Sequence, residues 1–591
     1  MSRNSLFSFI SIAIILSYNC RENSLNSKLP QQSPKPNIIW IVIDSLRADI
    51  IGRYGVTPNL EEFTKTAVTY NFHLVNAAWT RPSTIVFFTG KYASRSPVNF
   101  WDYPTTKEEV DLFYKKEKNP LPKYLKNFGY KTYMVGNNPF LTDKYGLGVD
   151  VGFDTLSDFS NYSSDTIKIT KKTLDIFDNE LKNSKEPFFF FLNFNDPHKP
   201  YTPPPGFTSR IKTTEVLEEK KQNYLGEVAF VDEELGKIFT FLKQAKLWDN
   251  SLILITADHG EVMHPNHSIS PFTGTNTYYG HGQDLFLENI HVPLLIKYPK
   301  QTTNFLVNDL TRSIDIYPTI LEVSSNPIPT DLDGESLVSL HKSTDIQPRF
   351  YYGETRSTQC YGEGSDFLLQ RSYRFHEIGK FWQGHVGQEF YIHTDIQSDP
   401  NQIFGMKIPD IERLDELKLD TNKKERILYL WKKLRSMEPK LPIYSIRYNL
   451  TRDSILKISI PHGKLRLIQM PKEITWKDTG RMIQLQFKQG GEKGLLRFEV
   501  YPDVSFPRIE ILQDSKKISE SEILIGNFGL SLSSCSFNCE LLYESPLGDP
   551  PGILEAKVHI WKQGGIAKNY ERSLDLGEEA LDILKKQGYV H

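Results

Sequence analysis

Three short stretches of the chain are apolar almost throughout, and each stops at acidic or histidine residues. They read NIIWIVID (Asn37–Asp44), PFFFFLNFNDPH (Pro187–His198) and SLILITADHGE (Ser251–Glu261). A continuous apolar run that is rich in β-branched or aromatic residues predicts a strand buried on both faces of a parallel sheet. We therefore expect three such strands, each delivering polar side chains at its carboxyl end.

A helical pattern lies between the second and third of these strands. Its apolar residues recur every three or four positions, and they are Tyr224, Val228, Val231, Leu235, Ile238 and Leu242. This spacing predicts a helix that covers the sheet. Strand, helix and strand in this order predict an α/β domain with a central, mostly parallel sheet flanked by helices.

Polar side chains follow all three predicted strands. They are Asp44, Asp196 with His198, and Asp258 with His259. In open α/β sheets, ligands bind outside the carboxyl ends of the strands, so we expect these side chains to converge on one site. Buried carboxylates need a cation or hydrogen-bond donors. Two aspartates and a neutral imidazole suit a divalent metal better than an arginine.

The pattern changes after about residue 441. The stretches YSIRYNLTRDSILKISI, GKLRLIQM and GRMIQLQFKQ alternate apolar and polar residues, with Gly, Asp and Lys between them. Such alternation predicts antiparallel strands with one solvated face. We expect a separate β-rich domain of unknown role over residues 441–591, closed by a helix near 577–586.

The amino terminus reads as an export signal. An apolar run from Leu6 to Leu16 follows Arg3 and is too short to span a bilayer. Cys20 stands where a bacterial lipoprotein signal is cut and acylated, and residues 21–36 suit a flexible tether. We expect an exported protein, periplasmic or at the cell surface, held by a lipid anchor on a bacterial membrane. Ordinary export with cleavage elsewhere is the alternative.

Composition narrows the function classes. The chain has 591 residues, of which 39% are hydrophobic, which indicates a globular protein with more than one domain. Its 70 lysines and arginines nearly cancel 72 aspartates and glutamates, so no nucleic-acid partner is expected. Cys535 and Cys539 are spaced for a short-loop disulfide, which leaves Cys360 unpaired.

The stretch WTRPSTIVFFTGKY places Thr80 at the start of an apolar helix. Thr80 could simply be the helix N-cap, because threonine before a proline and an apolar run is a usual helix start. It could also be a nucleophile, since a helix amino terminus favours negative charge on its oxygen. The two interpretations are compatible.

Eight blocks of the sequence resemble the sulfatases, a branch of the alkaline phosphatase superfamily, in the order of that family. The blocks are IVIDSLRADIIGRYGVTPNLEEF, WTRPSTIVFFTGKY, FNDPHKPYTPP, VAFVDEELGKI, LILITADHGE, YYGHGQDLFLENIHVPLLIKYP, SIDIYPTILE and LDGESL. The resemblance implies an alkaline-phosphatase-like catalytic domain over residues 37–345 and a sulfatase C-terminal subdomain over 346–440. The region after 441 is not covered.

The resemblance also implies site residues, position by position. The metal ligands would be Asp44, Asp258, His259 and the nucleophile Thr80, with Ser45 where many sulfatases have a second aspartate. The catalytic residues would be Thr80, His198 and His281. One divalent metal is expected, and two carboxylates, an imidazole and a hydroxyl fit calcium, manganese or zinc.

Three departures from the family concern the nucleophile and its surroundings. Thr80 replaces the formylglycine precursor, Thr84 replaces the arginine of the same box, and VGNNPF (Val135–Phe140) replaces GKWHLG. No formylglycine is expected, because threonine is not a substrate for that conversion. A sulfated threonine lacks the aldehyde exit of formylglycine, whereas a phosphorylated one can be attacked at phosphorus. Phosphoester chemistry is therefore favoured, as in the phosphodiesterases and the phosphoethanolamine and phosphoglycerol transferases.

Other interpretations remain open at this stage. Asp258 and His259 could form a structural ion pair, His198 and His281 could be loop residues, and Asp196, His198 and His281 could bind a second metal. His264 and His267 are expected on a solvent-facing loop.

The predicted function is a metal-dependent hydrolase or transferase that acts on a small-molecule, lipid-headgroup or glycan ester of phosphate or sulfate. The alternatives are a sulfuric ester hydrolase and a non-catalytic binder of glycans or anions.

Overall fold

The computed structural model describes residues 35–563 with gaps, and residues 582, 583 and 585. The gaps are 97–106, 161–165, 273, 275, 341–348, 356–357, 364–366, 373–389, 410, 412–413, 438–442, 451–453, 461–463, 470–474, 479–481, 487–491, 502–506, 514, 527–528 and 535–556. The predicted signal with Cys20, nearly all of the tether, the Cys535–Cys539 disulfide and most of the final helix lie outside the described residues.

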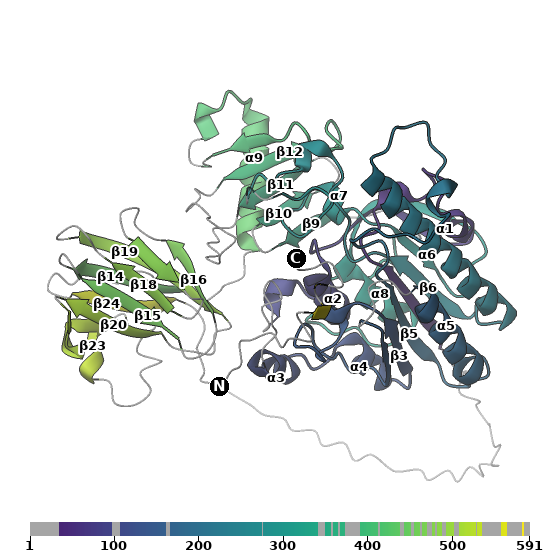
Figure 1. Ribbon diagram of the computed structural model, residues 1–591, viewed down its shortest axis with the longest axis horizontal. Coiled ribbons are helices and arrows are strands. Elements are labelled where there is room, and N and C mark those ends of the chain that lie inside the picture. Colours follow the sequence, from purple (N-terminus) through teal and green to yellow (C-terminus); the bar gives the residue numbers. More distant parts are fainter. Residues whose placement is uncertain are drawn as a thin grey trace, which may run out of the picture. The chain divides into compact units, whose positions relative to one another are not determined.

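An eight-stranded sheet carries the candidate site (Figure 1). Its strands lie in the order β4-β3-β5-β1-β6-β7-β2-β8. They are β1 (Asn37–Ile43), β2 (Val68–Leu74), β3 (Lys131–Gly136), β4 (Thr155–Asp158), β5 (Phe188–Phe194), β6 (Ser251–Thr256), β7 (Leu294–Lys297) and β8 (Phe305–Arg312). Only β7 runs antiparallel to its neighbours in this sheet. The mostly parallel sheet is confirmed, and the three predicted strands are the adjacent β5, β1 and β6.

Two hydrophobic cores, one on each face, explain why β1 is apolar throughout. Ile39, Ile41 and Ile43 pack into one core, and Ile38, Trp40 and Val42 pack into the other. Successive side chains of a strand point to opposite faces, so a strand buried on both faces has no position for a polar residue. The sheet is therefore the middle layer of three.

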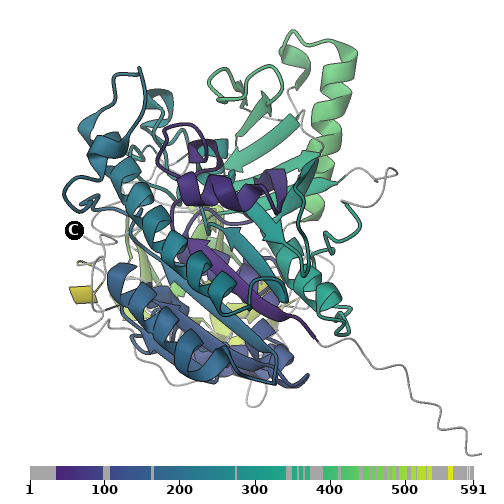
Figure 2. The same cartoon turned by 90° about the vertical axis from the view of Figure 1, so that its right-hand side faces the viewer.

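Helices form the outer layers. The first core includes residues of α1 (Pro58–Thr64), α5 (Thr166–Ile176) and α6 (Glu219–Gln244). The second includes residues of α2 (Thr80–Thr89), α3 (Lys107–Lys116), α4 (Leu121–Lys126) and α8 (Ile316–Val323). All six apolar residues that predicted α6 are buried in the first core. Figure 2 shows the blue to teal helices α5 and α6 lying across one face of the sheet.

A second, antiparallel sheet follows the catalytic sheet in the chain. It has the order β13-β12-β11-β10-β9. Its elements are β9 (Phe350–Glu354), β10 (Thr358–Glu363), β11 (Phe367–Ser372), β12 (Tyr391–Asp395), β13 (Met406–Ile408) and the helix α9 (Thr421–Ser436). Cys360 on β10 is buried and is a free cysteine among the described residues.

Two further sheets confirm the β-rich carboxyl-terminal region. One contains β16 (Lys464–Gln469), β19 (Glu492–Tyr501), β14 (Ile443–Leu450), β24 (Val558–Gln563), β22 (Ile523–Ile525) and β23 (Leu530–Ser531) in that order. The other contains β17 (Thr475–Asp478), β18 (Met482–Gln486), β15 (Ile455–Ser459), β20 (Arg508–Gln513) and β21 (Lys516–Lys517). Pairing is antiparallel except between β22 and β24. The domain boundaries themselves stay a prediction.

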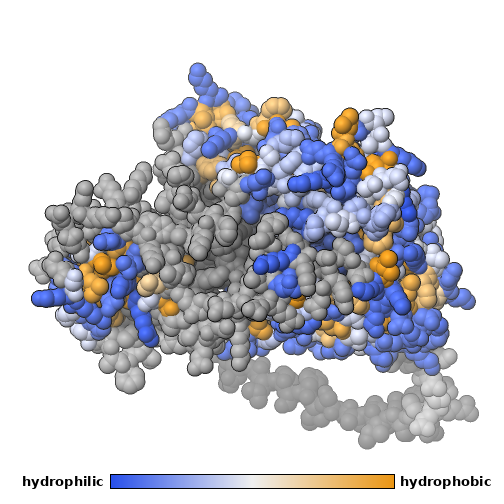
Figure 3. Space-filling model, in the orientation of Figure 1, coloured by the Kyte–Doolittle hydropathy of each residue, from blue (hydrophilic) through white to orange (hydrophobic). Residues whose placement is uncertain are grey.

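Among the described residues that face the viewer in Figure 3, hydrophobic ones are scattered among hydrophilic ones. Among the described residues, no helix has the length and apolar character needed to cross a bilayer.

One partly buried carboxylate, that of Glu288 on α7 (Leu287–Ile290), ties together the segments that carry the site. It accepts hydrogen bonds from Arg47 Nη1 (2.6 Å), the backbone amides of Met263 and His264 (3.0 and 2.9 Å), and His267 Nδ1 (2.8 Å). The prediction of a solvent-facing His267 is therefore wrong. The His267 ring is buried, and its other nitrogen lies 3.2 Å from the carbonyl oxygen of Gln402.

The pH dependence of folding tests this tie. Burial raises the pKa of Glu288, but hydrogen bonds and charge from His267 and Arg47 outweigh it and hold the pKa at about 2. The folded-state pKa lies below the unfolded value, so the stabilisation is complete above about pH 4.5 and is lost as pH falls towards 2. In Glu288→Gln we expect the free energy of unfolding at pH 7 to fall by roughly 3 kcal/mol and its slope between pH 5 and 2 to flatten.

Denaturant unfolding across that pH range is the measurement for Glu288→Gln. Glu233→Gln is the control, because Glu233 pairs with Arg210 on the surface, where an ion pair contributes only about 0 to 1 kcal/mol. An acid slope equal to that of the wild type in Glu288→Gln would contradict the assignment.

Candidate active site

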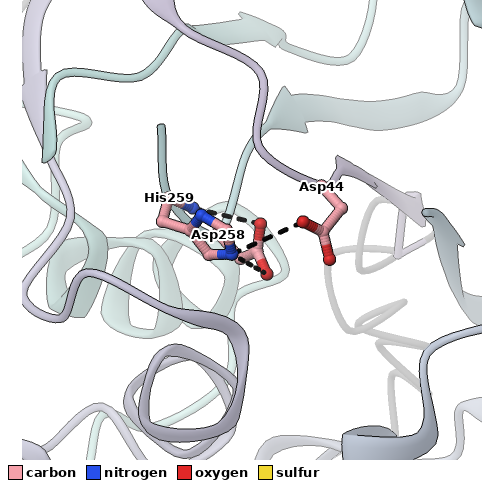
Figure 4. A group of neighbouring side chains, drawn as sticks. All are labelled: Asp44, Asp258 and His259. Carbon is pink, nitrogen blue, oxygen red and sulfur yellow. Dashed lines mark hydrogen bonds and ion pairs between the residues drawn. The ribbon is translucent and has the colours of Figure 1, made fainter. Parts of the chain in front are cut away.

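Asp44, Asp258 and His259 come together at the carboxyl ends of two adjacent strands. Asp44 follows β1, and Asp258 and His259 follow β6, which pairs with β1 in parallel register. Figure 4 shows the Asp44 carboxylate facing the other two side chains. His259 Nε2 lies 3.4 Å from Asp44 Oδ1 and 3.5 Å from Asp258 Oδ2. All three side chains are buried, as expected for residues that end a strand within the sheet.

The donor set fits a metal ion. One ligand atom from each residue lies within 4.8 Å of the other two, and this is the one such group of three found in the described part of the chain. His259 Nδ1 bonds the carbonyl oxygen of Gly260 at 2.9 Å, which directs the Nε2 lone pair of a neutral imidazole towards the carboxylates. Asp258 Oδ2 is buried and accepts no hydrogen bond among the described residues.

The charges of these three residues also favour a bound cation. Burial and the neighbouring Asp258 carboxylate raise the pKa of Asp44. Burial lowers the pKa of His259, but Asp258 and Asp44 outweigh it, so that pKa lies above its ordinary value. Two carboxylates held together away from water repel each other, and a divalent cation between them would remove that repulsion.

Ser45, the residue after Asp44, has a strained backbone. Its φ of 59° lies in the left-handed region, which is unfavourable for a residue with a side chain. In this conformation Ser45 Oγ donates to Asp44 Oδ1 at 2.8 Å, and the Tyr224 hydroxyl donates to the Ser45 carbonyl at 2.9 Å. Ser45 therefore holds the Asp44 carboxylate in place.

Thr80 is the first residue of α2, and its side chain does not cap the helix. The N-cap position belongs to Trp79, and no side-chain cap bond is present there. The Thr80 hydroxyl instead donates to Asp44 Oδ2 at 3.2 Å and lies 3.2 Å from His259 Nε2. The N-cap interpretation is therefore wrong, and the hydroxyl lies beside the predicted metal ligands.

Asn138 is a site residue that sequence reasoning missed. It lies in VGNNPF, after β3, at the N-cap of a short 3-10 helix (Pro139–Leu141). Its Nδ2 donates to Asp44 Oδ2 at 2.9 Å and to Asn195 Oδ1 at 3.0 Å, and it lies 3.5 Å from Thr80 Oγ1. The segment that lacks the lysine and histidine of the family thus supplies an amide donor. The Asn-Asn-Pro of this segment was the available signal.

His198 and His281 lie in one row of rings with His259. The ring centroids of His259 and His281 are 4.0 Å apart, and those of His281 and His198 are 5.0 Å apart. Burial lowers the pKa of His198 and of His281 well below the ordinary value, so both rings are neutral at pH 7. His198 Nδ1 bonds the Lys199 carbonyl at 2.7 Å, and His281 Nδ1 lies 3.4 Å from Glu261 Oε2.

Two further features complete the site. Arg47 binds Asp49 Oδ1 and the Glu261 carbonyl, both at 2.9 Å, in addition to Glu288, so it braces the loop after β6. Asp196, His198 and His281 do not form a three-ligand metal group among the described residues, where only the first set meets that test.

The sequence matches two family models. Residues 36–325 match the Sulfatase family, and residues 279–406 match the carboxyl-terminal region of N-sulphoglucosamine sulphohydrolase. Residues after 406, which include the β-rich region, lie outside both matches.

Individual relatives agree with the family models. An ulvan-active sulfatase of Formosa agariphila is 23% identical over 381 residues, which cover 56% of this chain and 71% of the relative. An endo-4-O-sulfatase of Bacteroides thetaiotaomicron is 22% identical, covering 69% and 93%. The phosphonate monoester hydrolase of Agrobacterium radiobacter has a similar structure, with a TM-score of 0.51 and 16% identity over 68% of this chain and 96% of that one.

The fold, the two family matches and these relatives lead to one assignment. Residues 36–325 form a Sulfatase-family domain of the alkaline phosphatase superfamily, and the chain is an ester-hydrolysing enzyme.

Proposed function

We propose that the chain is a phosphoester hydrolase or phosphotransferase that uses Thr80 as its nucleophile. The position of the Thr80 hydroxyl, 3.2 Å from Asp44 Oδ2 and 3.2 Å from His259 Nε2, carries the proposal. A hydroxyl that close to a carboxylate has an acceptor for its proton when it attacks an ester. The amino-terminal dipole of α2 adds to this, because it favours negative charge on the attacking oxygen.

The chemistry of the second step favours phosphorus over sulfur. A formylglycine hydrate carries two hydroxyls, so a sulfated hydrate expels sulfate by collapsing to the aldehyde. Threonine carries one hydroxyl, and its sulfate ester has no such exit. A phosphorylated threonine can be attacked at phosphorus by water or an alcohol, which breaks the bond to the Thr80 oxygen and returns a proton to that oxygen.

The other residues would assist as follows. Asp44 takes the proton of Thr80 in the first step and returns it in the second. Asn138, through its 2.9 Å bond to Asp44 Oδ2, keeps that carboxylate oriented towards the hydroxyl. His198 and His281, next to His259, stabilise the transition state and help the leaving oxygen depart.

A divalent metal bound by Asp44, Asp258, His259 and Thr80 would lower the pKa of the attacking hydroxyl and neutralise the charge of the ester oxygens. Its identity is proposed as calcium, manganese or zinc, since the set mixes oxygen and nitrogen donors.

The substrate is proposed to be a small-molecule, lipid-headgroup or glycan ester. A sulfate ester is the second candidate, and the names of the ulvan-active sulfatase and the endo-4-O-sulfatase favour it. The site of action is proposed to be outside the cytoplasm, with a lipid anchor at Cys20.

Replacing the nucleophile tests the proposal directly. In Thr80→Ala we expect turnover of a nitrophenyl phosphodiester to fall at least about a thousandfold, because the attacking oxygen is gone. The purified wild type and the variant are each assayed with four matched substrates: a nitrophenyl phosphodiester, phosphomonoester, phosphonate and sulfate ester. Thr89→Ala is the control, since Thr89 is a buried threonine of the same helix whose hydroxyl donates to the Ile85 carbonyl and accepts from the Lys91 amide, away from the site residues.

The assays with the four esters have two outcomes that would contradict the proposal. Phosphoester turnover that is retained in Thr80→Ala would reject Thr80 as the nucleophile. Sulfate release faster than phosphoester turnover, lost in the same variant, would show that the missing aldehyde exit is no obstacle and would favour the second candidate.

Metal binding gives a prediction that does not depend on turnover. We expect one divalent ion per chain by calorimetry after chelation and reloading, and no tight binding in Asp258→Ala. At a hundredfold excess over the dissociation constant, the ion should stabilise the fold by about 3 kcal/mol. Asp284→Asn is the control, because Asp284 is also buried and acidic but bonds Asn289 instead. Equal metal affinity in Asp258→Ala and the wild type would contradict the ligand set.

A further inference from the structure

Lys199 places a positive charge beside the row of histidine rings. It follows His198 directly, and its backbone carbonyl accepts the bond from His198 Nδ1 at 2.7 Å. Its ammonium nitrogen lies 3.9 Å from the position that a Cβ would take on Gly280, the residue before His281. Lys199 is thus next to one histidine in the chain and has its ammonium group near the residue that precedes the other, and its side chain is half-buried.

No acidic partner holds this ammonium group among the described residues. Arg47, on the neighbouring loop, is paired with Asp49 and Glu288. Arg81, next to Thr80, bonds the Leu147 carbonyl through Nε at 2.6 Å. Lys199, in contrast, makes no ion pair or side-chain hydrogen bond in the described part of the chain. An ammonium group that is not engaged by a carboxylate is available to bind an anion.

The charge of Lys199 affects the pKa values of His281 and Glu261. Besides burial and His259, Lys199 is the remaining influence that lowers the pKa of His281. It also opposes the rise in the pKa of Glu261 that burial causes.

We propose that Lys199 binds a negatively charged, non-bridging oxygen of the substrate ester and so selects anionic esters. The inference rests on the proposed function, since it assumes that the ester is held beside Thr80 and the histidine row. A lysine ammonium is a compact charge with three donors, which suits an oxygen of phosphate or sulfate. Lys199 is thereby a specificity residue, and it does not take part in proton transfer.

The test separates anion binding from catalysis. Binding of inorganic phosphate to the metal-loaded protein is measured by calorimetry, in Thr80→Ala so that no turnover is needed. Lys199→Met in that background should weaken phosphate binding roughly tenfold, as expected for one charge-assisted contact at a half-exposed site. Lys199→Arg should restore most of the affinity, because it keeps the charge.

Kinetics with the nitrophenyl phosphodiester provide the second readout, with Thr80 intact. Lys199→Met should raise KM roughly tenfold and leave kcat within about twofold. Lys220→Met is the matched control. Lys220 is an exposed lysine whose ammonium group lies over the ring of Tyr279, the residue before Gly280, and its replacement should change neither KM nor kcat. All variants are compared at equal metal loading and with unfolding midpoints that match the wild type.

The remaining outcomes overturn the inference. Unchanged phosphate affinity in Lys199→Met would reject anion binding, and equal losses in Lys199→Met and Lys199→Arg would reveal a packing role. A fall in kcat at constant phosphate affinity would place Lys199 in the chemical step. Failure of the Thr80 proposal looks different, because turnover would then persist in Thr80→Ala whatever residue occupies position 199.

Discussion

The close approach of two buried carboxylates, Asp44 and Asp258, is the constraint on which the site depends. Both follow strands that lie side by side in the middle of the sheet, so neither can move away without disturbing the core. Their mutual repulsion is strong in a region with little water, and a cation is the simplest means of relieving it. The strained Ser45 and the amide of Asn138 hold one of these carboxylates in position.

The same arrangement bears on the proposed role of Thr80 as the nucleophile. The hydroxyl is fixed between a carboxylate and an imidazole by a buried helix, all of whose residues are inaccessible to solvent. A nucleophile that is already oriented loses little entropy when it reacts. Threonine is stiffer than serine at χ1, which suits a hydroxyl that has one productive direction.

The fold could be predicted from the sequence because its central strands are buried on both faces. β1, β5 and β6 read as continuous apolar runs, and α6 reads as a helix, for the same reason: each has a core to fill. The placement of Asp44, Asp258 and His259 followed from the rule for strand ends. The family resemblance led to Thr80, His198 and His281, whose proposed roles await experiment.

Other features depended on contacts between distant parts of the chain. Asn138 reaches Asp44 only because β3 and β1 both pair with β5, which the pattern along the chain does not reveal. His267 is buried by Glu288 and by Gln402, which is 135 residues away, so a polar stretch was mistaken for a solvent-facing loop. Lys199 carries no signal in the sequence beyond its position after His198.

The central claim is that the Thr80 oxygen becomes covalently bound to the substrate's phosphoryl group. Rapid acid quenching during turnover of a phosphodiester, followed by peptide mass spectrometry, tests it most directly. The account predicts that the peptide containing Thr80 gains the phosphoryl part of the substrate, and that the modification disappears once substrate is exhausted. An unmodified Thr80 peptide throughout turnover, or modification at another residue, would contradict it.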